Sequence, residues 1–313
     1  MSAAPLPVTP AMIEDAAARI APWITRTPVL EVPAGRLGLD RPCVLKLESL
    51  QVTGVFKARG AFNTLLPAAV PPAGVVTASG GNHGAAVACA AHALGVPARV
   101  FVPSICPSSK LALLRRFDAE VTVGGERYAD ALAASRADAE ESGALFVHAY
   151  DQASVIAGQG TIARELQAQA SCDTILVPVG GGGLVAGIAA WQTGDVRVVA
   201  VEPETAPTLN RALAHGAPVD VEVGGVAADA LGATRIGDLP FAIAREKVAA
   251  SVLVADDAIR QTQALIWEEL HLLVEPAGAT SLAALTSGAY TPHPDERVAA
   301  ILSGANAAAT LAW

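Results

Sequence analysis

The chain has 313 residues, of which 52% are hydrophobic and 16% are charged, and this balance predicts a folded protein rather than a disordered one. Its formal net charge at pH 7 is −9 and it has no basic run, so neither nucleic acid nor an anionic membrane surface is an expected partner. The longest apolar stretch, residues 84–102, is interrupted by His92, Pro97 and Arg99, and it predicts a buried helix followed by a strand rather than a membrane span.

The N-terminal residues, Met1 to Pro5, lack the basic and apolar regions of a secretory signal. The four cysteines lack metal or redox spacing, so we expect reduced thiols in a cytoplasmic protein. The six histidines are dispersed along the chain, and no metal site is predicted.

Short apolar strands alternate with helices along most of the chain. Helices are expected over residues 10–20, in a short segment ending near 66, and over 85–94, 108–117, 128–141, 155–168, 184–192, 257–273 and 277–285. Strands are expected over 44–48, 75–78, 98–102, 120–123, 145–148, 174–179, 196–201 and 298–302. A Pro-rich link precedes the first strand, and residues 216–250 are expected to be rich in loops. This alternation predicts an α/β fold with parallel sheets that helices cover on both faces.

One lysine, between the first expected strand and the short helix, has an unusual sequence context. Only four of the 21 basic residues are lysines, yet Lys57 lies between Phe56 and the small residues of 58–61. A partly desolvated ammonium has a lowered pKa, and its neutral amine can attack a carbonyl group. Taken alone, Lys57 is more readily interpreted as a lysine whose ammonium reaches the surface from a loop.

Two glycine-rich loops follow strands, at the sheet edge where α/β proteins bind ligands. In the first, Gly180 to Gly183 precede a helix, so the backbone could approach an anion closely and the helix N-terminus could bind a phosphate. In the second, residues 79–84, a hydroxyl, an amide and an imidazole lie among glycines and suit a carboxylate or a ring oxygen. Each loop could also be a plain turn.

The glycine run also satisfies a dinucleotide-binding pattern. Gly181, Gly183 and Ala186 match G-x-G-x-x-A, and Glu202 ends the next strand near the place of a ribose-binding acid. A nicotinamide-dependent oxidoreductase is therefore a competing hypothesis. Two points count against this hypothesis. It gives no role to Lys57 or to residues 79–84, and the dinucleotide-binding pattern lies in the middle of the chain.

Taken together, these motifs resemble the threonine/serine dehydratase group of fold-type II pyridoxal-phosphate enzymes, to which the serine racemases are related. The matching segments, in chain order, are Phe56 to Ala61, Ser79 to His83, Val155 to Thr161, Gly180 to Leu184, Leu273 to Ala279 and Leu302 to Asn306. Any one of them would be weak, but their order and spacing over nearly the whole chain make the resemblance specific.

The resemblance implies a fold like that of the tryptophan synthase β subunit, with two open, mostly parallel twisted sheets covered by helices. It further implies a large domain of residues 1–68 and 152–313 that binds pyridoxal 5'-phosphate. Residues 69–151 would form a small mobile domain, and the protein would be a homodimer acting on a small amino acid.

The resemblance also implies individual roles. Lys57 would bind the cofactor as a Schiff base and remove the substrate's α-proton. The cofactor would further contact Phe56, Asn82, Gly180, Gly181, Gly182, Gly183, Leu184, Glu275 and Ser303, although Glu275 could instead be structural. The substrate would contact Ser79, Gly80, Gly81, Asn82, His83 and Tyr150. A serine such as Ser303 at the pyridine nitrogen does not stabilise a pyridinium, which favours elimination over transamination.

Several positions depart from the family pattern. Val55 replaces a frequent serine, and Gly80 lies where racemases carry a second proton-handling serine, so racemisation ranks below dehydration. Metal-dependent relatives would use the positions of Glu202, Ala206 and Thr208, and the missing acid at the last position argues against a specific divalent cation.

The expected function is therefore β-elimination of L-threonine or L-serine to a 2-oxo acid and ammonia. The alternatives are a lyase for another β-hydroxy amino acid, such as phenylserine or hydroxyaspartate, a serine racemase, the oxidoreductase described above, and a binding protein without catalysis. A β-replacement synthase is disfavoured because its sequence elements are absent.

Overall fold

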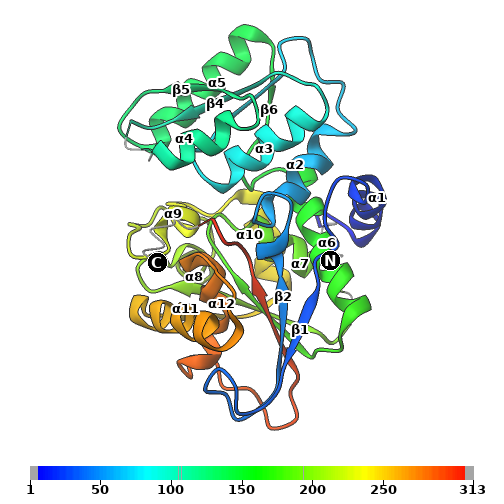
Figure 1. The fold of residues 1–313 in the computed structure, drawn as a ribbon, viewed down its shortest axis with the longest axis vertical. Helices are drawn as coiled ribbons and strands as arrows, with labels where there is room; N and C mark the ends of the chain where they lie inside the picture. Colours follow the sequence, from blue (N-terminus) through cyan, green and yellow to red (C-terminus); the bar gives the residue numbers. More distant parts are fainter. Residues whose placement is uncertain (1–5, 105, 107, 193, 307–313) are drawn as a thin grey trace.

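The computed structural model describes residues 6–104, 106, 108–192 and 194–306. It contains two open sheets covered by helices, which form the lower and upper lobes in Figure 1. Among the strand pairs within these two sheets, only one is antiparallel and the others are parallel. The predicted α/β class with two mostly parallel sheets is confirmed.

The larger sheet has six strands in the order β1-β2-β10-β7-β8-β9. Their bounds are β1 Val29–Val32, β2 Cys43–Leu47, β10 Val298–Leu302, β7 Thr174–Pro178, β8 Arg197–Pro203 and β9 Val248–Val254. The edge strand β1 is antiparallel to β2. The central strands β7 and β10 are buried along their whole length, as their near-continuous apolar sequences require.

The smaller sheet has four parallel strands in the order β5-β4-β3-β6. Their bounds are β5 Glu120–Val123, β4 Ala98–Val102, β3 Val75–Ala78 and β6 Leu145–Phe146. The helices of this lobe are α3 Asn82–Ala93, α4 Ser108–Arg115 and α5 Tyr128–Ser142.

Helices cover both faces of the larger sheet because alternate residues of its strands point to opposite sides. Ile175, Val177 and Ile301 pack on one side with α1, α6, α7 and α10, whereas Leu176 and Leu302 pack on the other with α11 and α12. The helices are α1 Pro10–Ile20, α2 Lys57–Leu65, α6 Ala153–Gln169, α7 Gly183–Trp191, α8 Thr208–His215, α9 Ala228–Leu231, α10 Asp238–Lys247, α11 Asp256–Leu270 and α12 Pro276–Thr286, with a 3-10 turn η1 at Glu48–Leu50.

Helix α2 lies where the two lobes meet (Figure 1). Its residues Ala58, Ala61 and Phe62 belong to the apolar core of the smaller lobe, and a second side packs on α6. The first residue of this helix is Lys57. The predicted domain boundaries, and the mobility of the smaller lobe, stay predictions.

The structure corrects several predicted elements. The Pro-rich link contains β1, whose four residues include only one that is buried and are too few for a clear pattern. Residues 216–250, expected to be loops, contain α9, α10 and the start of β9, and α8 just before them was not expected. Strand β9 is an edge strand with five intermediate residues, so it lacks the apolar run that identified β7 and β10.

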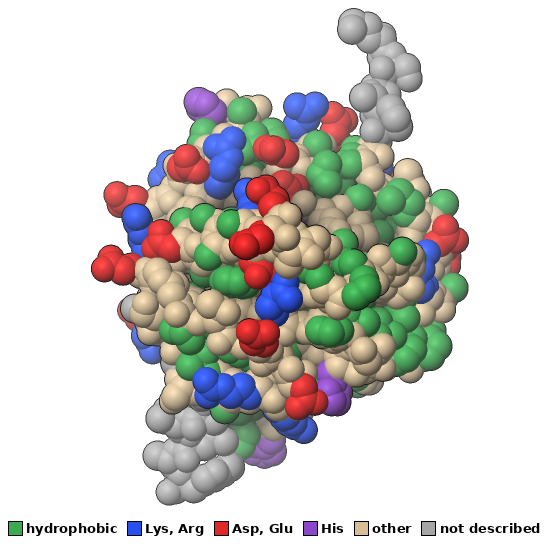
Figure 2. Space-filling model, turned by 90° about the horizontal axis from the view of Figure 1, so that it is seen from above, with side chains coloured by type: hydrophobic (Ala, Val, Ile, Leu, Met, Phe, Trp, Pro, Cys, Tyr) green, Lys and Arg blue, Asp and Glu red, His purple; other side chains and the backbone are tan. Residues whose placement is uncertain are grey.

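On the face shown in Figure 2, acidic and basic side chains are interspersed, and no continuous basic area is visible among the described residues. Within the part of the chain that the structure describes, no helix has both the length and the hydropathy needed to cross a bilayer.

Candidate active site

A pocket lies at the carboxyl ends of β7 and β10, the edge of an open α/β sheet at which ligands bind. It brings together all the cofactor-site residues that the sequence predicted. The pocket is lined by Phe56, Lys57, Asn82, Tyr150, Pro178, Gly180, Gly181, Gly182, Gly183, Leu184, Ala230, Leu231, Glu275, Ala277 and Ser303.

The Lys57 side chain lines this pocket from the N-terminus of α2. Its Nζ donates a hydrogen bond to the carbonyl oxygen of Ala149 at 2.8 Å and lies 5.2 Å from the ring centre of Phe56. Burial lowers the pKa of Lys57 to about 8, although the Glu275 carboxylate opposes this shift. A larger fraction of this amine is therefore neutral near pH 8 than of an exposed lysine, and the neutral amine is the nucleophile.

The loop of residues 180–183 presents unpaired backbone donors to the pocket. Among the described residues, none accepts a hydrogen bond from the N–H groups of residues 180–184, and Gly180, Gly182 and Gly183 are buried. Gly182 has a φ angle of 91°, in the left-handed region that favours glycine. Buried N–H groups without acceptors are rare, and here they precede the positive end of α7, so the loop fits an anion such as a phosphate.

The Tyr150 ring packs directly on this loop. A methyl group at Gly181 would overlap the ring, and one at Gly183 would lie 3.1 Å from Tyr150 Cβ. The ring also contacts His148 at 4.8 Å between centroids, and its hydroxyl donates to the carbonyl oxygen of Arg235 at 3.4 Å. Tyr150, predicted on the substrate side, thus contacts the loop predicted to hold the phosphate.

Asn82 is held by hydrogen bonds on both ends of its amide. Its Nδ2 donates to Glu275 Oε1 at 2.8 Å, and its Oδ1 accepts from Asn306 Nδ2 at 3.0 Å. This arrangement leaves one Nδ2 hydrogen for a ligand oxygen. Burial raises the pKa of Glu275 to about 7, although the Asn82 hydrogen bond acts in the opposite direction.

Ser303 follows β10 and is buried at the pocket wall. Its hydroxyl donates to the carbonyl oxygen of Ala277 at 3.2 Å, and its own carbonyl accepts from the Phe56 N–H at 3.2 Å. The second contact ties the segment before Lys57 to the end of β10. An uncharged hydroxyl is therefore held at the position that the sequence assigned to a pyridine nitrogen partner.

The loop of residues 79–84 contributes less to this pocket than the sequence predicted. Asn82 lines the pocket, whereas Ser79, Gly80, Gly81 and His83 do not. Ser79 Oγ accepts a hydrogen bond from the Gly81 N–H at 3.2 Å. His83 is buried with Nε2 3.2 Å from the carbonyl oxygen of Val147, and burial lowers its pKa to about 3, so its imidazole is neutral.

Glu202 does not fit the ribose-binding role of a dinucleotide enzyme. Its carboxylate is fully buried, and its two oxygens accept hydrogen bonds from the N–H groups of Leu209 and Asn210 at the start of α8. The glutamate thus satisfies free donors of a helix N-terminus. The oxidoreductase hypothesis loses the acid on which its pattern depended.

Sequence reasoning missed several groups of the pocket. Ala230 and Leu231 come from α9, inside the region expected to be rich in loops. Pro178 precedes the glycine run, and Ala277 lies inside the recognised segment from Leu273 to Ala279 without an assigned role. The carbonyl oxygen of Ala149, which binds the lysine, belongs to the backbone and leaves no trace in the side-chain sequence.

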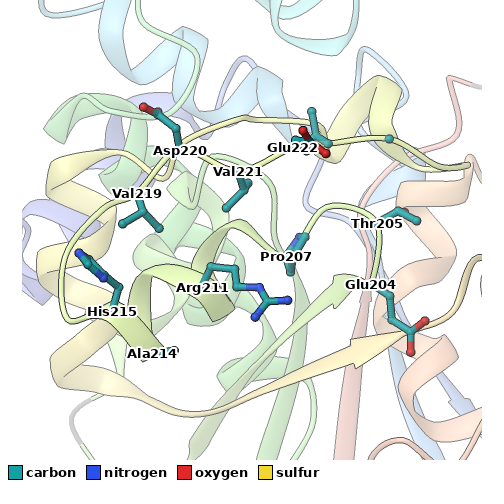
Figure 3. Close-up of a pocket in the computed structure, with 12 residues that line it drawn as sticks. Glu204, Thr205, Pro207, Arg211, Ala214, His215, Val219, Asp220, Val221 and Glu222 are labelled. Atoms are coloured by element: carbon teal, nitrogen blue, oxygen red, sulfur yellow. The ribbon is translucent and has the colours of Figure 1, made fainter.

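A second hollow of about 900 Å³ lies between α8 and residues 219–224 (Figure 3). Arg211 and Val221 project into it, and Glu204, Asp220 and Glu222 lie around it. None of the catalytic, cofactor or substrate residues predicted from the sequence lines this hollow, so the pocket at Lys57 is the candidate active site.

The chain is similar to known proteins over most of its length. Residues 20–304 match the family described as pyridoxal-phosphate dependent enzyme. The chain is 40% identical to an L-threonine ammonia-lyase of Geobacter sulfurreducens over 96% of this chain and 76% of that protein. It is 35% identical to a phenylserine dehydratase of Ralstonia pickettii over 94% of this chain and 92% of that protein. The structure of maize serine racemase superposes with a TM-score of 0.90 at 33% identity, covering 96% of this chain and 94% of that one.

Pyridoxal phosphate fits the described residues. The unpaired N–H groups of residues 180–184 suit its phosphate, and the amine of Lys57 suits its aldehyde. The hydroxyl of Ser303 suits its ring nitrogen once its hydrogen turns away from the carbonyl oxygen of Ala277. The match over most of the chain and the similarity of the relatives show that the chain belongs to the pyridoxal-phosphate dependent enzymes, with pyridoxal 5'-phosphate as its cofactor.

Proposed function

We propose that this protein is a β-eliminating lyase, a dehydratase that converts L-threonine, L-serine or both to a 2-oxo acid and ammonia. The observation that carries the proposal is the lysine amine of lowered pKa in the same pocket as the unpaired N–H groups of residues 180–184. The named activity of the Geobacter sulfurreducens relative, L-threonine ammonia-lyase, supports the same substrate.

Pyridoxal phosphate, when bound, supplies an electron-withdrawing ring that makes the proton on the substrate's Cα acidic. In this proposal the N–H groups of residues 180–184 hold the phosphate, Asn82 binds the ring oxygen, Phe56 packs on the ring, and Glu275 holds the Asn82 amide. The N–H groups of the loop at Ser79 hold the substrate carboxylate, which requires the smaller lobe to close over the pocket.

Lys57 is then the group that moves protons. Its neutral amine accepts the Cα proton at Nζ, and the β-hydroxyl departs as water after it receives a proton from the resulting Lys57 ammonium. Hydrolysis of the dehydrated product gives the 2-oxo acid and ammonia. Ser303, a neutral hydroxyl rather than a carboxylate, does not hold a proton on the ring nitrogen, and this supports elimination over transamination.

The glycine at position 80 favours a lyase reaction over racemisation. Inversion at Cα needs a proton donor on the face opposite Lys57, and glycine carries none. A side chain at Gly80 would overlap the sulfur of Cys106, so this chain could not carry a serine there without moving the cysteine. Lyases for phenylserine or hydroxyaspartate remain the alternatives within the same chemistry, the first because of the Ralstonia pickettii relative.

A panel of substrates on the yellow holoenzyme tests the proposal. L-threonine, L-serine, phenylserine, hydroxyaspartate and D-serine are compared by 2-oxo acid formation, with Lys57→Ala as the inactive control. Turnover of threonine or serine above the others is expected. Preference for phenylserine or hydroxyaspartate would contradict the substrate, and D-serine formation faster than 2-oxo acid formation would contradict the reaction.

A holoenzyme that turns over none of these substrates would support a binding protein without catalysis.

We also propose, from the family resemblance, a cytoplasmic homodimer. Light scattering of the purified protein would contradict the dimer if it gave the mass of one chain.

A further inference from the structure

Four charged side chains form a buried cluster behind Lys57, away from the pocket. Lys46, Glu48 and Arg59 are 0% exposed and Glu165 is 8% exposed. None of the four lines the pocket. Burying charges has a large free-energy cost unless every one is paired, so this charged cluster calls for an explanation.

Arg59 is the centre of the charged cluster and bonds to both carboxylates. Its Nε and Nη2 each donate to one oxygen of Glu48 at 2.8 Å, and its Nη1 and Nη2 donate to the two oxygens of Glu165 at 2.7 and 2.9 Å. Its Nη1 also donates to Thr161 Oγ1 at 3.1 Å. A planar guanidinium that binds two carboxylates in this way has its orientation fixed.

Lys46 completes the charge balance. Its Nζ donates to Glu165 Oε2 at 2.7 Å, to Gln169 Oε1 at 2.8 Å and to the carbonyl oxygen of Thr27 at 2.7 Å. Burial disfavours the charge of Arg59, but the two carboxylates outweigh this effect and raise its pKa. Burial lowers the pKa of Lys46, and the attraction of Glu165 and Glu48 opposes this shift. With two basic and two acidic side chains, the charged cluster has a formal charge of zero.

The helices that the charged cluster connects touch through glycine. A methyl group at Gly158 of α6 would lie 2.6 Å from the carbonyl oxygen of Arg59, and one at Gly60 would lie 3.0 Å from that of Val155. Glycine contacts allow α2 and α6 to approach closely, and near the C-terminal end of α2 the side chains of Asn63 and Thr64 bond to Ser154 of α6. Near the N-terminal end of α2, which carries Lys57, the directional hydrogen bonds of Arg59 to Thr161 and Glu165 constrain how far one helix slides along the other.

Helix α6 also packs against α7, the helix that follows the glycine loop of residues 180–183. A methyl group at Gly160 would lie 2.8 Å from the carbonyl oxygen of Gly187, so α6 and α7 are in backbone contact. Helix α7 begins at the glycine loop, and α2 begins at Lys57. The position of α2 on α6 therefore sets the separation between the lysine amine and the N–H groups of residues 180–184.

Lys57 and Arg59 point to opposite sides of α2, because two residues turn an α-helix by roughly 200°. We propose that Arg59 is a positioning residue: by binding Glu48 and Glu165 it fixes α2 on α6, so that the Lys57 amine faces the anion-binding loop. Arg59 does not line the pocket and therefore acts through Lys57.

The test measures how the cofactor-free protein binds pyridoxal phosphate, from the rise of the yellow absorbance, and needs no substrate. Arg59→Lys keeps the charge but cannot bind two carboxylates bidentately. Arg99→Lys is the matched control, because Arg99 binds Asp138 through two nitrogens in the smaller lobe. We expect binding to slow at least about tenfold in R59K and to be unchanged in R99K, since small misplacements of a reacting group are costly. Thermal unfolding is recorded for both variants.

A lowered melting temperature in R59K with wild-type binding would show that the charged cluster only stabilises the fold, and would overturn the proposal. If R59K does not fold, Thr161→Val and Thr161→Ser decide, since only the serine keeps the hydroxyl that binds Arg59. Slower binding in T161V alone supports the proposal, and equal binding overturns it. Wild-type protein that binds the cofactor but turns over no hydroxy amino acid would refute the proposed function and leave this test intact.

Discussion

Glu275 accepts a hydrogen bond from the Asn82 amide at 2.8 Å and so joins the N-terminus of α12 to that of α3. The glutamate precedes α12 in the larger lobe, and the asparagine begins α3 in the smaller one. The contact lies in the wall of the active-site pocket, and the carboxyl group that makes it is buried.

The raised pKa of Glu275 predicts a pH-dependent stability. The carboxyl titrates at about 7 when folded and at an ordinary value of 4.5 when unfolded, so between these values the folded chain binds the additional proton. This contribution to stability is present at pH 4.5 and is lost as the pH rises through 7; the shift corresponds to about 3 kcal/mol. Denaturant unfolding of cofactor-free protein at pH 5 and 8 should show a smaller loss in Glu275→Gln than in wild type.

Glu202, whose pKa is also about 7, contributes equally to both proteins in that experiment, so the difference between them reports Glu275 together with its attraction to Lys57. The same pH dependence in wild type and Glu275→Gln would show that the carboxyl is not desolvated as the structure indicates.

The lowered pKa of Lys57 predicts when its amine reacts. Only the neutral amine binds an aldehyde, so the rate of pyridoxal phosphate binding by cofactor-free protein should rise with pH and level off above about 8. An exposed lysine would level off above its ordinary value of 10.5. Stopped-flow absorbance from pH 6 to pH 10 measures the midpoint, and Lys57→Ala should give no signal. A midpoint near 10 would contradict the buried environment of the amine.

The parts of the fold that were predicted correctly are those with strong local patterns. Strands β7 and β10 are apolar runs, and Thr9 and Pro10 identify the start of α1, where Thr9 Oγ1 accepts from the Met12 N–H. Strand β9 and helix α9 lack such patterns, because an edge strand is partly exposed and a helix of four residues has no periodicity.

In the pocket, the sequence predicted the side chains that lie in distinctive motifs. It did not predict the backbone groups, or the residues from distant segments, that also line the pocket or bind Lys57. Lys57, Asn82 and Ser303 each lie in a recognisable motif. The carbonyl oxygen of Ala149 and the four-residue helix that carries Leu231 depend on how the chain returns to the pocket, which no local pattern encodes.

The contact between Tyr150 and the glycine loop predicts a specific effect of a single methyl group. In Gly181→Ala the new methyl would overlap the Tyr150 ring, so the loop or the ring must move, and pyridoxal phosphate should bind at least about tenfold more weakly. Gly194→Ala is the control, because a methyl group there meets no atom within 4 Å. Equilibrium titration by absorbance measures both. Wild-type affinity in Gly181→Ala would show that the loop adapts and that its packing on Tyr150 does not shape the anion site.

The ion pair between Lys110 and Asp229 connects the two lobes beside the pocket, since Lys110 lies on α4 and Asp229 on α9. Lys110 Nζ would lie 3.9 Å from a methyl group at Gly81, so the cation also faces the loop predicted to bind the substrate carboxylate. Because the side chain of Asp229 is 63% exposed, the pair itself should contribute less than about 1 kcal/mol to stability.

Loss of the ion pair between Lys110 and Asp229 should instead affect substrate binding. Asp229→Asn frees the Lys110 ammonium for the substrate carboxylate, so KM should fall a few-fold at low salt with kcat unchanged, and Lys110→Met should raise KM. The double variant should match Lys110→Met, because without the lysine the aspartate has nothing to release. Steady-state kinetics at low and high ionic strength measure these constants. A raised KM in Asp229→Asn would show that the pair works by holding the lobes together, and that the aspartate does not compete with the substrate for the lysine.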